Sequence, residues 1–136
     1  MYTDRQLISA ALNAAKNSYS PYSGCTVGAA LLTVSGKLFT GCNIENAAFS
    51  PTCCAERTAI FKAVSEGERN FLKIAVAGGK NGRFSLKFTP CGTCRQVLAE
   101  FCEENFEIIT AESESSFKKY RLGELLPEIF SSDEVV

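Results

Sequence analysis

The sequence predicts a three-layer α/β/α domain in which helices pack on a central mixed sheet of five strands. Two observations lead to this class. Five short apolar runs alternate with longer amphipathic segments, and no repeat, low-complexity tract or linker interrupts the 136 residues. Strands that alternate with helices need crossover connections, which pack the helices against the sheet. We therefore expect one domain over residues 1–136, long enough to bury a substantial core.

A helix and then a hairpin are expected at the beginning of the chain. Residues 3–17 open with Thr3-Asp4-Arg5-Gln6, which has the form of a capping box, and their apolar side chains follow at helical spacing. Residues 26–34 are almost continuously apolar, as in a strand that is covered on both faces. Ser35-Gly36 then turns the chain into a second strand at 37–42.

Helices and strands alternate in the rest of the chain. Ser50-Pro51 has the residue types of an N-cap and a first helical residue, and the helix that it opens should end at Gly67. An apolar strand at 71–77 leads into a loop that contains Gly78-Gly79, and Pro90 opens a third helix. The chain is expected to close with strands at 106–111 and 117–121 and a short helix at 122–126.

The composition excludes several kinds of function. The chain has no histidine, so a Ser-His-Asp triad and an imidazole-ligated metal are impossible. Any proton carrier near neutral pH must then be a carboxylate, Lys, Tyr or Cys whose pKa is tuned by its surroundings. A formal net charge of −1 offers no basic field for a phosphate backbone, which argues against duplex nucleic acid as a partner. Small neutral ligands remain possible partners.

The cellular compartment is inferred from what the sequence lacks. No apolar run approaches the ~20 residues of a membrane helix, and the first residues do not resemble a secretory signal. We therefore expect a cytoplasmic protein without a membrane partner. In that reducing compartment seven cysteines, an odd number, are better explained by metal binding or free thiols than by disulfides.

Three cysteines stand at two predicted helix starts. Cys91 and Cys94 are three residues apart and share a helix face, and Cys54 would be a third ligand for one ion. Three thiolates leave one position of a tetrahedral Zn²⁺ open, which is typical of a catalytic rather than a structural zinc. A structural zinc clip and simple buried thiols are the alternatives, and Cys53 could complete a closed site with four cysteines.

Glu56 follows Cys54 by two residues, about 200° round an ideal helix, so it can border the metal but is badly placed to bind it. It is the candidate proton carrier of the motif, against the simpler reading of a solvated acid at a helix start. Three thiolates and Zn²⁺ sum to a net charge of −1, which nearby donors should offset. The candidates for this role are Arg57, Arg95 and, more weakly, Gln96.

At these residues the chain resembles the zinc-dependent cytidine deaminases, specifically their small homotetrameric branch with three cysteine ligands. The resemblance extends over residues 7–130 and includes Cys54-Ala55-Glu56 and Pro90-Cys91-Gly92-Thr93-Cys94. Further matching segments are residues 21–23, 27–32, 41–47 and 124–127. A match of this length is specific, whereas Cys-x-x-Cys alone would be weak.

The resemblance implies hydrolytic deamination of cytidine and 2′-deoxycytidine to the uridines, in pyrimidine salvage, with one Zn²⁺ per subunit. A zinc-bound hydroxide would attack C4 of the base while Glu56 protonates N3 and then helps ammonia to leave. Asn43, Ile44 and Glu45 would hold the ribose, with the Asn43 and Glu45 side chains on the 3′-hydroxyl. The backbone of Ala55 and Thr89 would contact the base, and a neighbouring subunit of a homotetramer would lend Phe130 to the pocket.

Two residues depart from the family pattern. Cys25 stands where an aromatic residue commonly packs near the substrate, and Phe49 stands where tyrosine is frequent. The substitution at Cys25 keeps open a different cytosine nucleoside as substrate, such as an antibiotic of the blasticidin type. From another class, a zinc-clip binding module without turnover, for single-stranded RNA for example, is the alternative, although the acidic balance speaks against it.

Overall fold

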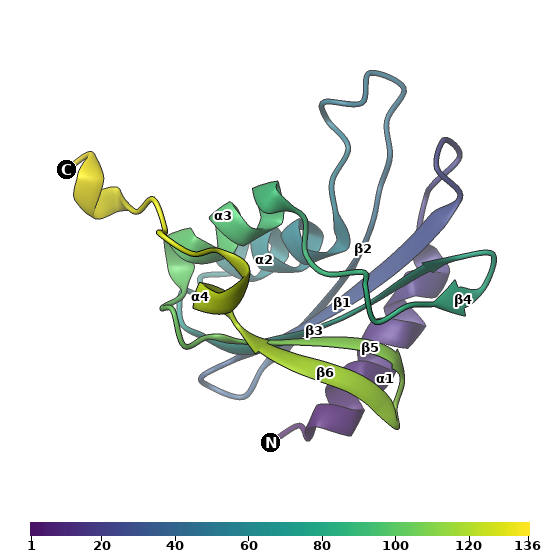
Figure 1. The fold of residues 1–136 in the computed structure, drawn as a ribbon, viewed down its shortest axis with the longest axis horizontal. Coiled ribbons are helices and arrows are strands. Elements are labelled where there is room, and N and C mark those ends of the chain that lie inside the picture. Colours follow the sequence, from purple (N-terminus) through teal and green to yellow (C-terminus); the bar gives the residue numbers. More distant parts are fainter.

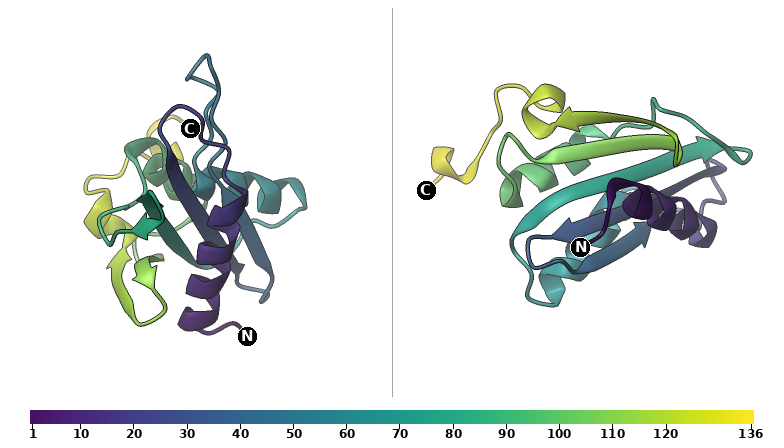
Figure 2. Two further views of the ribbon diagram at one scale, coloured as in Figure 1. Left: turned by 90° about the vertical axis from the view of Figure 1, so that its right-hand side faces the viewer. Right: turned by 90° about the horizontal axis from the view of Figure 1, so that it is seen from below.

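A computed structural model describes all 136 residues and confirms the predicted three layers (Figures 1 and 2). None of its helices combines the length and the apolar character that a membrane crossing requires. Single 3-10 turns lie at Ala15–Asn17 and Ser132–Glu134. The helices and strands are α1 (Asp4–Ala14), β1 (Cys25–Thr33), β2 (Leu38–Cys42), α2 (Ala55–Ser65), β3 (Phe71–Lys80), β4 (Arg83–Phe84), α3 (Gly92–Phe101), β5 (Glu107–Ser113), β6 (Ser116–Arg121) and α4 (Leu122–Leu125).

The central sheet is mixed, as predicted, and its five main strands lie in the order β2-β1-β3-β5-β6. Strands β3 and β5 are parallel, with Ile74 opposite Ile108, and α3 lies in the crossover between them. All other neighbouring pairs are antiparallel. The short strand β4 pairs with the end of β3 and adds a sixth member to the sheet.

Two apolar cores explain why β1 has an almost unbroken apolar sequence. Ala29 and Leu31 face the core under α2 and α3, whereas Ala30 and Leu32 face the core under α1. All four side chains are completely buried, because successive residues of a strand point to opposite faces of the sheet. Helix α1 therefore covers one face, and α2 and α3 cover the other (Figure 2).

Gly41 lets the start of α2 lie directly on β2. A Cβ atom at this residue would be 2.5 Å from the carbonyl oxygen of Ala55 and 2.6 Å from the amide nitrogen of Ala59. Any larger residue would push the helix away from the sheet. The close approach fixes where α2 begins, and with it the position of Cys54.

The first helix begins as predicted. The Thr3 side chain accepts a hydrogen bond from the Gln6 amide at 3.2 Å, and the Gln6 side chain accepts one from the Thr3 amide at 2.8 Å, which completes the capping box.

Of the other three predicted helix starts, that of α4 at Leu122 is right, and those of α2 and α3 were wrong by a few residues. Helix α2 begins at Ala55 with Cys54 as N-cap, and not at Ser50-Pro51, which lies in a turn. The reason is a backbone bridge between Ile44 and Cys53, with both N–H···O bonds at 2.9 Å, which keeps the chain extended up to the N-cap. Helix α3 begins at Gly92 with Cys91 as N-cap, two residues after Pro90.

The loop predicted around Gly78-Gly79 is a continuation of β3, which runs to Lys80 before a tight turn leads into β4. A Cβ atom at Gly79 would be 1.8 Å from the Arg83 carbonyl oxygen, so the missing side chain permits this close pairing. Glycine here marks a crowded strand and not a loop.

Two loops and the chain end project from the layers. The loop between β2 and α2 and the loop before β1 rise beside each other from one end of the sheet, and the chain after α4 extends away from the body (Figure 1). The helix starts that carry the three cysteines lie at the base of the first loop.

Candidate active site

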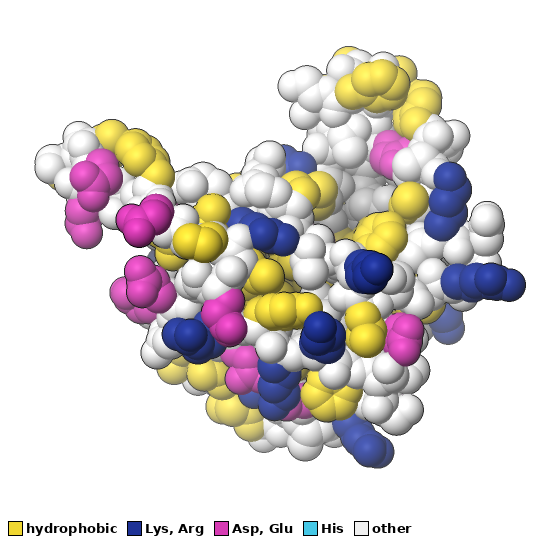
Figure 3. Space-filling view, in the orientation of Figure 1, with side chains coloured by type: hydrophobic (Ala, Val, Ile, Leu, Met, Phe, Trp, Pro, Cys, Tyr) yellow, Lys and Arg dark blue, Asp and Glu magenta, His cyan; other side chains and the backbone are white.

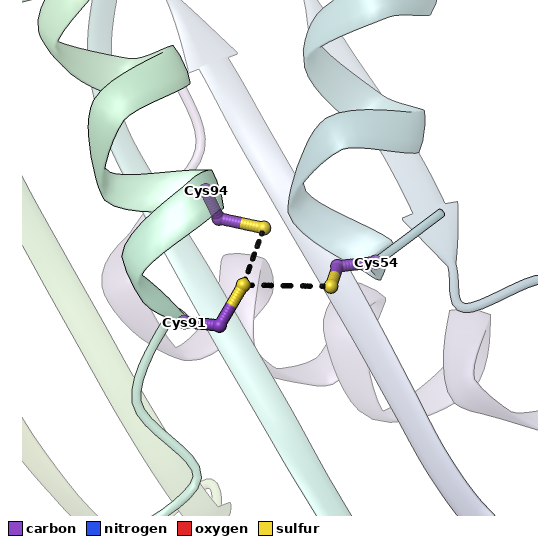
Figure 4. Close-up of side chains that lie close together, drawn as sticks. All are labelled: Cys54, Cys91 and Cys94. Atoms are coloured by element: carbon purple, nitrogen blue, oxygen red, sulfur yellow. Dashed lines mark hydrogen bonds between the residues drawn. The ribbon is translucent and has the colours of Figure 1, made fainter. Parts of the chain in front are cut away.

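Cys54, Cys91 and Cys94 come together between the starts of α2 and α3 (Figure 4). The Cys91 Sγ atom is 3.7 Å from that of Cys54 and 3.5 Å from that of Cys94, and all three lie within 4.8 Å of one another. Two of these residues are helix N-caps and the third lies in a first turn, where free backbone N–H groups favour negative charge.

The donor set fits zinc. A tetrahedral ion with Zn–S bonds of about 2.3 Å holds its sulfur atoms about 3.8 Å apart, close to the distances from the Cys91 sulfur to the other two sulfur atoms. Cys53 is not part of the cluster: its backbone pairs with Ile44, and its sulfur accepts a hydrogen bond from the Thr58 hydroxyl at 3.6 Å. The arrangement therefore offers three ligands and leaves a fourth position to a small molecule.

Arg57 supplies positive charge at the cluster. Its guanidinium donates to the Cys54 sulfur at 3.4 Å and to the Thr52 carbonyl oxygen at 3.2 Å. The neighbouring Cys94 thiol, the Arg57 guanidinium and the Cys91 thiol stabilise the Cys54 thiolate, and they lower the pKa of Cys54 to about 5 against the opposing effect of burial. The buried Nε of Arg57 has no partner, so one further donor is directed into this region.

The same interaction has the opposite effect on the third thiol. The neighbouring Cys54 sulfur, together with burial, raises the pKa of Cys94. In the metal-free cluster negative charge is therefore favoured on Cys54, beside the arginine, and disfavoured on Cys94. A divalent cation would replace the shared protons and stabilise all three residues as thiolates.

Glu56 is buried, with 3% of its surface exposed, in the first turn of α2. Burial raises the pKa of this carboxyl to about 7, and the negative charge of Cys54 adds to the rise, whereas its own backbone amide and Arg57 oppose it. A carboxyl with a pKa near the operating pH can both accept and donate a proton. The alternative of a solvated acid at a helix start does not fit this burial.

Arg95 and Gln96 have other partners than the sulfur atoms. The Arg95 guanidinium donates to the carbonyl oxygens of Pro90, at 2.6 Å, and Leu125, at 2.5 Å, and to the Thr89 hydroxyl at 3.0 Å. Gln96 donates to the Phe130 carbonyl oxygen at 2.9 Å. Arg95 thus fixes the segment that leads into α3, and Gln96 holds the chain beyond α4.

A cavity of about 200 Å³ lies beside the cysteines, below the projecting loop (Figure 3). Of the predicted site residues, Asn43, Glu45, Cys54, Ala55, Glu56, Thr89 and Cys91 line it. Ile44, 46% exposed, and Phe130, 59% exposed, do not. Sequence reasoning missed the remaining lining residues, which are Val27, Thr52, Cys53, Val76 and Phe88. A larger, open hollow of about 720 Å³ between the end of α3 and the chain after α4 contains none of the cysteine cluster.

Phe88 is the only aromatic residue that lines the cavity. Its ring packs on Gly78 of β3, where an added Cβ atom would be 2.4 Å from the ring. The sequence carried no direct signal for this role, since Phe88 belongs to no regular pattern. Cys25 does not line the cavity, and Phe49 lies in the projecting loop with its ring edge-on to Tyr22 at 5.9 Å.

The side chains of Asn43 and Glu45, which also line the cavity, already make hydrogen bonds within the protein. The buried Asn43 side chain accepts from the Val27 amide and donates to the Cys25 carbonyl oxygen, each at 2.9 Å. Glu45 accepts three hydrogen bonds from Tyr22 and Ser23, and the Ser23 hydroxyl above all lowers the pKa of this carboxyl. Both side chains keep part of their hydrogen-bonding capacity for a ligand.

Comparisons with known proteins agree with this site. Residues 1–110 match the family of the cytidine and deoxycytidylate deaminase zinc-binding region. The chain is 44% identical over 130 residues to a cytidine deaminase of Sporosarcina psychrophila, covering 96% of this chain and 93% of that protein. It is 45% identical over 129 residues to a probable cytidine deaminase of Dictyostelium discoideum, covering 95% of this chain and 84% of that protein. The crystal structure of cytidine deaminase from Burkholderia pseudomallei superposes with a TM-score of 0.84 at 41% identity, covering 95% of this chain and all of that one.

Proposed function

Because the chain belongs to the family of the cytidine and deoxycytidylate deaminase zinc-binding region, we propose that it deaminates cytidine and 2′-deoxycytidine by hydrolysis, to the uridines and ammonia. The observation that carries this proposal is the buried Glu56 beside three convergent thiols at one small cavity. The high identity to cytidine deaminases over nearly the whole chain favours a plain nucleoside over an antibiotic, and an enzyme over a zinc clip without turnover.

Cys54, Cys91 and Cys94 would hold the zinc ion. When bound, zinc supplies a water molecule whose pKa is lowered to about 7 and which serves as the nucleophile. Arg57, which already donates to the Cys54 sulfur, offsets part of the charge of the three thiolates.

Glu56 moves the protons of the reaction. Its carboxylate accepts one proton from the nucleophilic water and delivers it to N3 of the cytosine ring, as the water oxygen bonds to C4. It then carries the second water proton to N4, and the C4–N4 bond breaks to release ammonia. The proton on N3 stays in the uridine product, so atoms and charge balance. A pKa of about 7 suits both directions of transfer.

The other lining residues would orient the nucleoside. The flat ring of Phe88 would stack on the base, and the backbone of Ala55 and Thr89 would contact its edge. With C4 placed at Glu56, the sugar extends toward Asn43 and Glu45, which would bind the 3′-hydroxyl.

We further propose a homotetramer in which a neighbouring subunit completes the site. The cavity, about 200 Å³, is smaller than the ~300–1,000 Å³ of ordinary ligand sites, so part of a nucleoside would stay uncovered in one chain. Phe130 is exposed in the segment that follows α4, as a residue lent to a neighbour would be. Sedimentation that shows a fully active monomer would exclude this arrangement. From the same proposal we expect the protein to act in the cytoplasm, in pyrimidine salvage.

Loss of ultraviolet absorbance with cytidine and 2′-deoxycytidine as substrates tests the proposed activity, together with the zinc content of the same sample. We expect one zinc per chain and turnover of both nucleosides. Protein that holds one zinc per chain and leaves both nucleosides unchanged would refute the proposal in favour of the zinc clip.

A further inference from the structure

The carboxylate of Glu45 is fastened by the turn that precedes β1. Its Oε1 atom accepts hydrogen bonds from the backbone amides of Tyr22, at 2.9 Å, and Ser23, at 3.1 Å. Its Oε2 atom accepts one from the Ser23 hydroxyl at 2.5 Å. Ser23 therefore holds both oxygens of a carboxylate that lies 22 residues further along the chain.

The Ser23 hydroxyl has a fixed direction. Its oxygen accepts a hydrogen bond from the Cys25 amide at 3.0 Å, so its one proton is left for the Glu45 carboxylate. An N–H···O–H···O⁻ chain of this kind orients the hydroxyl without help from a buried environment, and Ser23 is in fact exposed.

The backbones of the two segments are also joined. The Tyr19 amide donates to the Asn43 carbonyl oxygen at 3.0 Å, and the Glu45 amide donates to the Tyr19 carbonyl oxygen at 2.8 Å. These bonds bring the turn next to Glu45 whatever the side chain at residue 23 is. Ser23 is the one side chain that donates to the carboxylate, so its hydroxyl holds Oε2 while the two backbone amides hold Oε1.

The fastened carboxylate keeps room for one more donor. An ionised carboxylate offers about four lone-pair sites, and three are used here. Glu45 lines the same cavity as Glu56, on the side where the sugar of a bound nucleoside would lie. A carboxylate that is oriented before the ligand arrives binds it without a further ordering cost.

We propose that Ser23 is a positioning residue for substrate binding: its hydroxyl holds the Glu45 carboxylate in the orientation that accepts the 3′-hydroxyl of the nucleoside. This inference rests on the proposed function, since it assigns the sugar end of the same site. Ser23 touches neither the base nor the reacting atoms, so its effect should fall on KM and not on kcat.

Kinetics of Ser23→Ala with cytidine and with 3′-deoxycytidine test the proposal. For cytidine we expect KM to rise about five- to tenfold, the equivalent of roughly one ordinary hydrogen bond, with kcat unchanged. For 3′-deoxycytidine, which lacks the hydroxyl that Glu45 would bind, the same substitution should leave KM unchanged. Ser23→Thr, which keeps the hydroxyl, should restore the cytidine KM, and Glu45→Ala should abolish the effect of Ser23→Ala.

Ser20→Ala is the matched control, because Ser20 lies in the same turn and its hydroxyl does not donate to Glu45. If Ser23→Ala and Ser20→Ala raise KM equally, or if Ser23→Ala impairs both nucleosides alike, the effect is one of loop structure and the proposal is overturned.

Nuclear magnetic resonance titration of the Glu45 carboxyl separates this inference from the proposed function, because it needs no turnover. The Ser23 hydroxyl lowers the pKa of this carboxyl, so Ser23→Ala should raise it toward its ordinary value. A wild-type protein without cytidine turnover would defeat the proposed function, and the titration would still report whether Ser23 holds the carboxylate. An unchanged Glu45 pKa in Ser23→Ala would show that it does not.

Discussion

At the scale of single residues, the chemistry of this site depends on environment more than on residue type. Of 15 acidic residues in the chain, Glu56 and Glu45 line the cavity, and their pKa values move in opposite directions. Burial raises the pKa of Glu56 to about 7, whereas donors from Tyr22 and Ser23 lower that of Glu45. One carboxyl is thereby suited to transferring protons and the other to accepting hydrogen bonds as a permanent anion.

Phe88→Leu should weaken substrate binding and spare the chemical step. Leucine keeps an apolar surface but loses the flat ring, and stacking of a base on an aromatic side chain contributes about 1–3 kcal/mol. We expect KM for cytidine to rise about tenfold, with kcat within about twofold of wild type. Phe61→Leu, on the exposed side of α2, is the matched control. Equal KM values for the two variants would remove Phe88 from the base-binding surface.

At the scale of the elements, the starts of α2 and α3 hold the three cysteines together. Gly41 determines where the start of α2 lies. Gly41→Ala places a Cβ atom 2.5 Å from the Ala55 carbonyl oxygen, so α2 must shift away from β2 and carry Cys54 with it. We expect about 1–3 kcal/mol less stability in urea unfolding of the zinc-free protein, and weaker zinc retention against a chelator.

Gly92→Ala is the control for this substitution. Gly92 directly follows Cys91 at the start of α3, and nothing lies within 4 Å of a Cβ atom added there. Its stability should stay within about 0.5 kcal/mol of wild type. Equal stability and zinc retention in Gly41→Ala and Gly92→Ala would contradict the close approach of α2 to the sheet.

Asp4 ties the start of α1 to strands β3 and β6 of the sheet. It is 3.0 Å from the Lys73 ammonium and 2.7 Å from that of Lys119, and Lys119 above all holds the pKa of this carboxyl below 3.8. A carboxyl whose pKa is lower in the folded state stabilises the fold above its unfolded pKa, and the contribution disappears as the pH falls through the folded pKa.

Asp4→Asn should therefore cost about 1 kcal/mol at neutral pH and almost nothing once the pH lies below the folded pKa of Asp4. Urea unfolding of both proteins, without zinc, at neutral pH and at pH values stepped well below 3.8 measures this difference. Glu124→Gln, which removes an exposed ion pair with Arg121, serves as the control and should have little effect at any pH. A difference that persists unchanged at the lowest pH would contradict the ionic role of Asp4.

At the scale of the whole molecule, local features were predictable and long-range ones were not. The capping box at Thr3 and the double-sided burial of β1 follow from neighbouring residues and from periodicity, and both could be predicted. The start of α2 could not, because it depends on the bridge that Cys53 makes with Ile44. The Ser50-Pro51 pair has the right residue types for a helix start but lies in the wrong tertiary setting.

The same distinction applies to the site. Cys54, Cys91, Cys94 and Glu56 carry their signal in spacing and residue type, and they do converge. Val27 and Val76 look like ordinary core residues of a strand, and only the fold shows that they line a cavity. The partners of Arg95, which are oxygens from residues 89, 90 and 125, likewise become visible only when distant segments are brought together.

The central claim is that a chain without histidine performs the reaction with three thiolates for zinc and Glu56 for the protons. Zinc content and cytidine turnover of Glu56→Gln, compared with wild type, test it most directly. Glutamine keeps the size and polarity of the side chain but cannot carry a proton, so we expect one zinc per chain, an unchanged circular dichroism spectrum and a kcat at least about 100-fold lower. Glu66→Gln, at the exposed end of α2, should retain full activity. Turnover by Glu56→Gln within about tenfold of wild type would show that another group moves the protons.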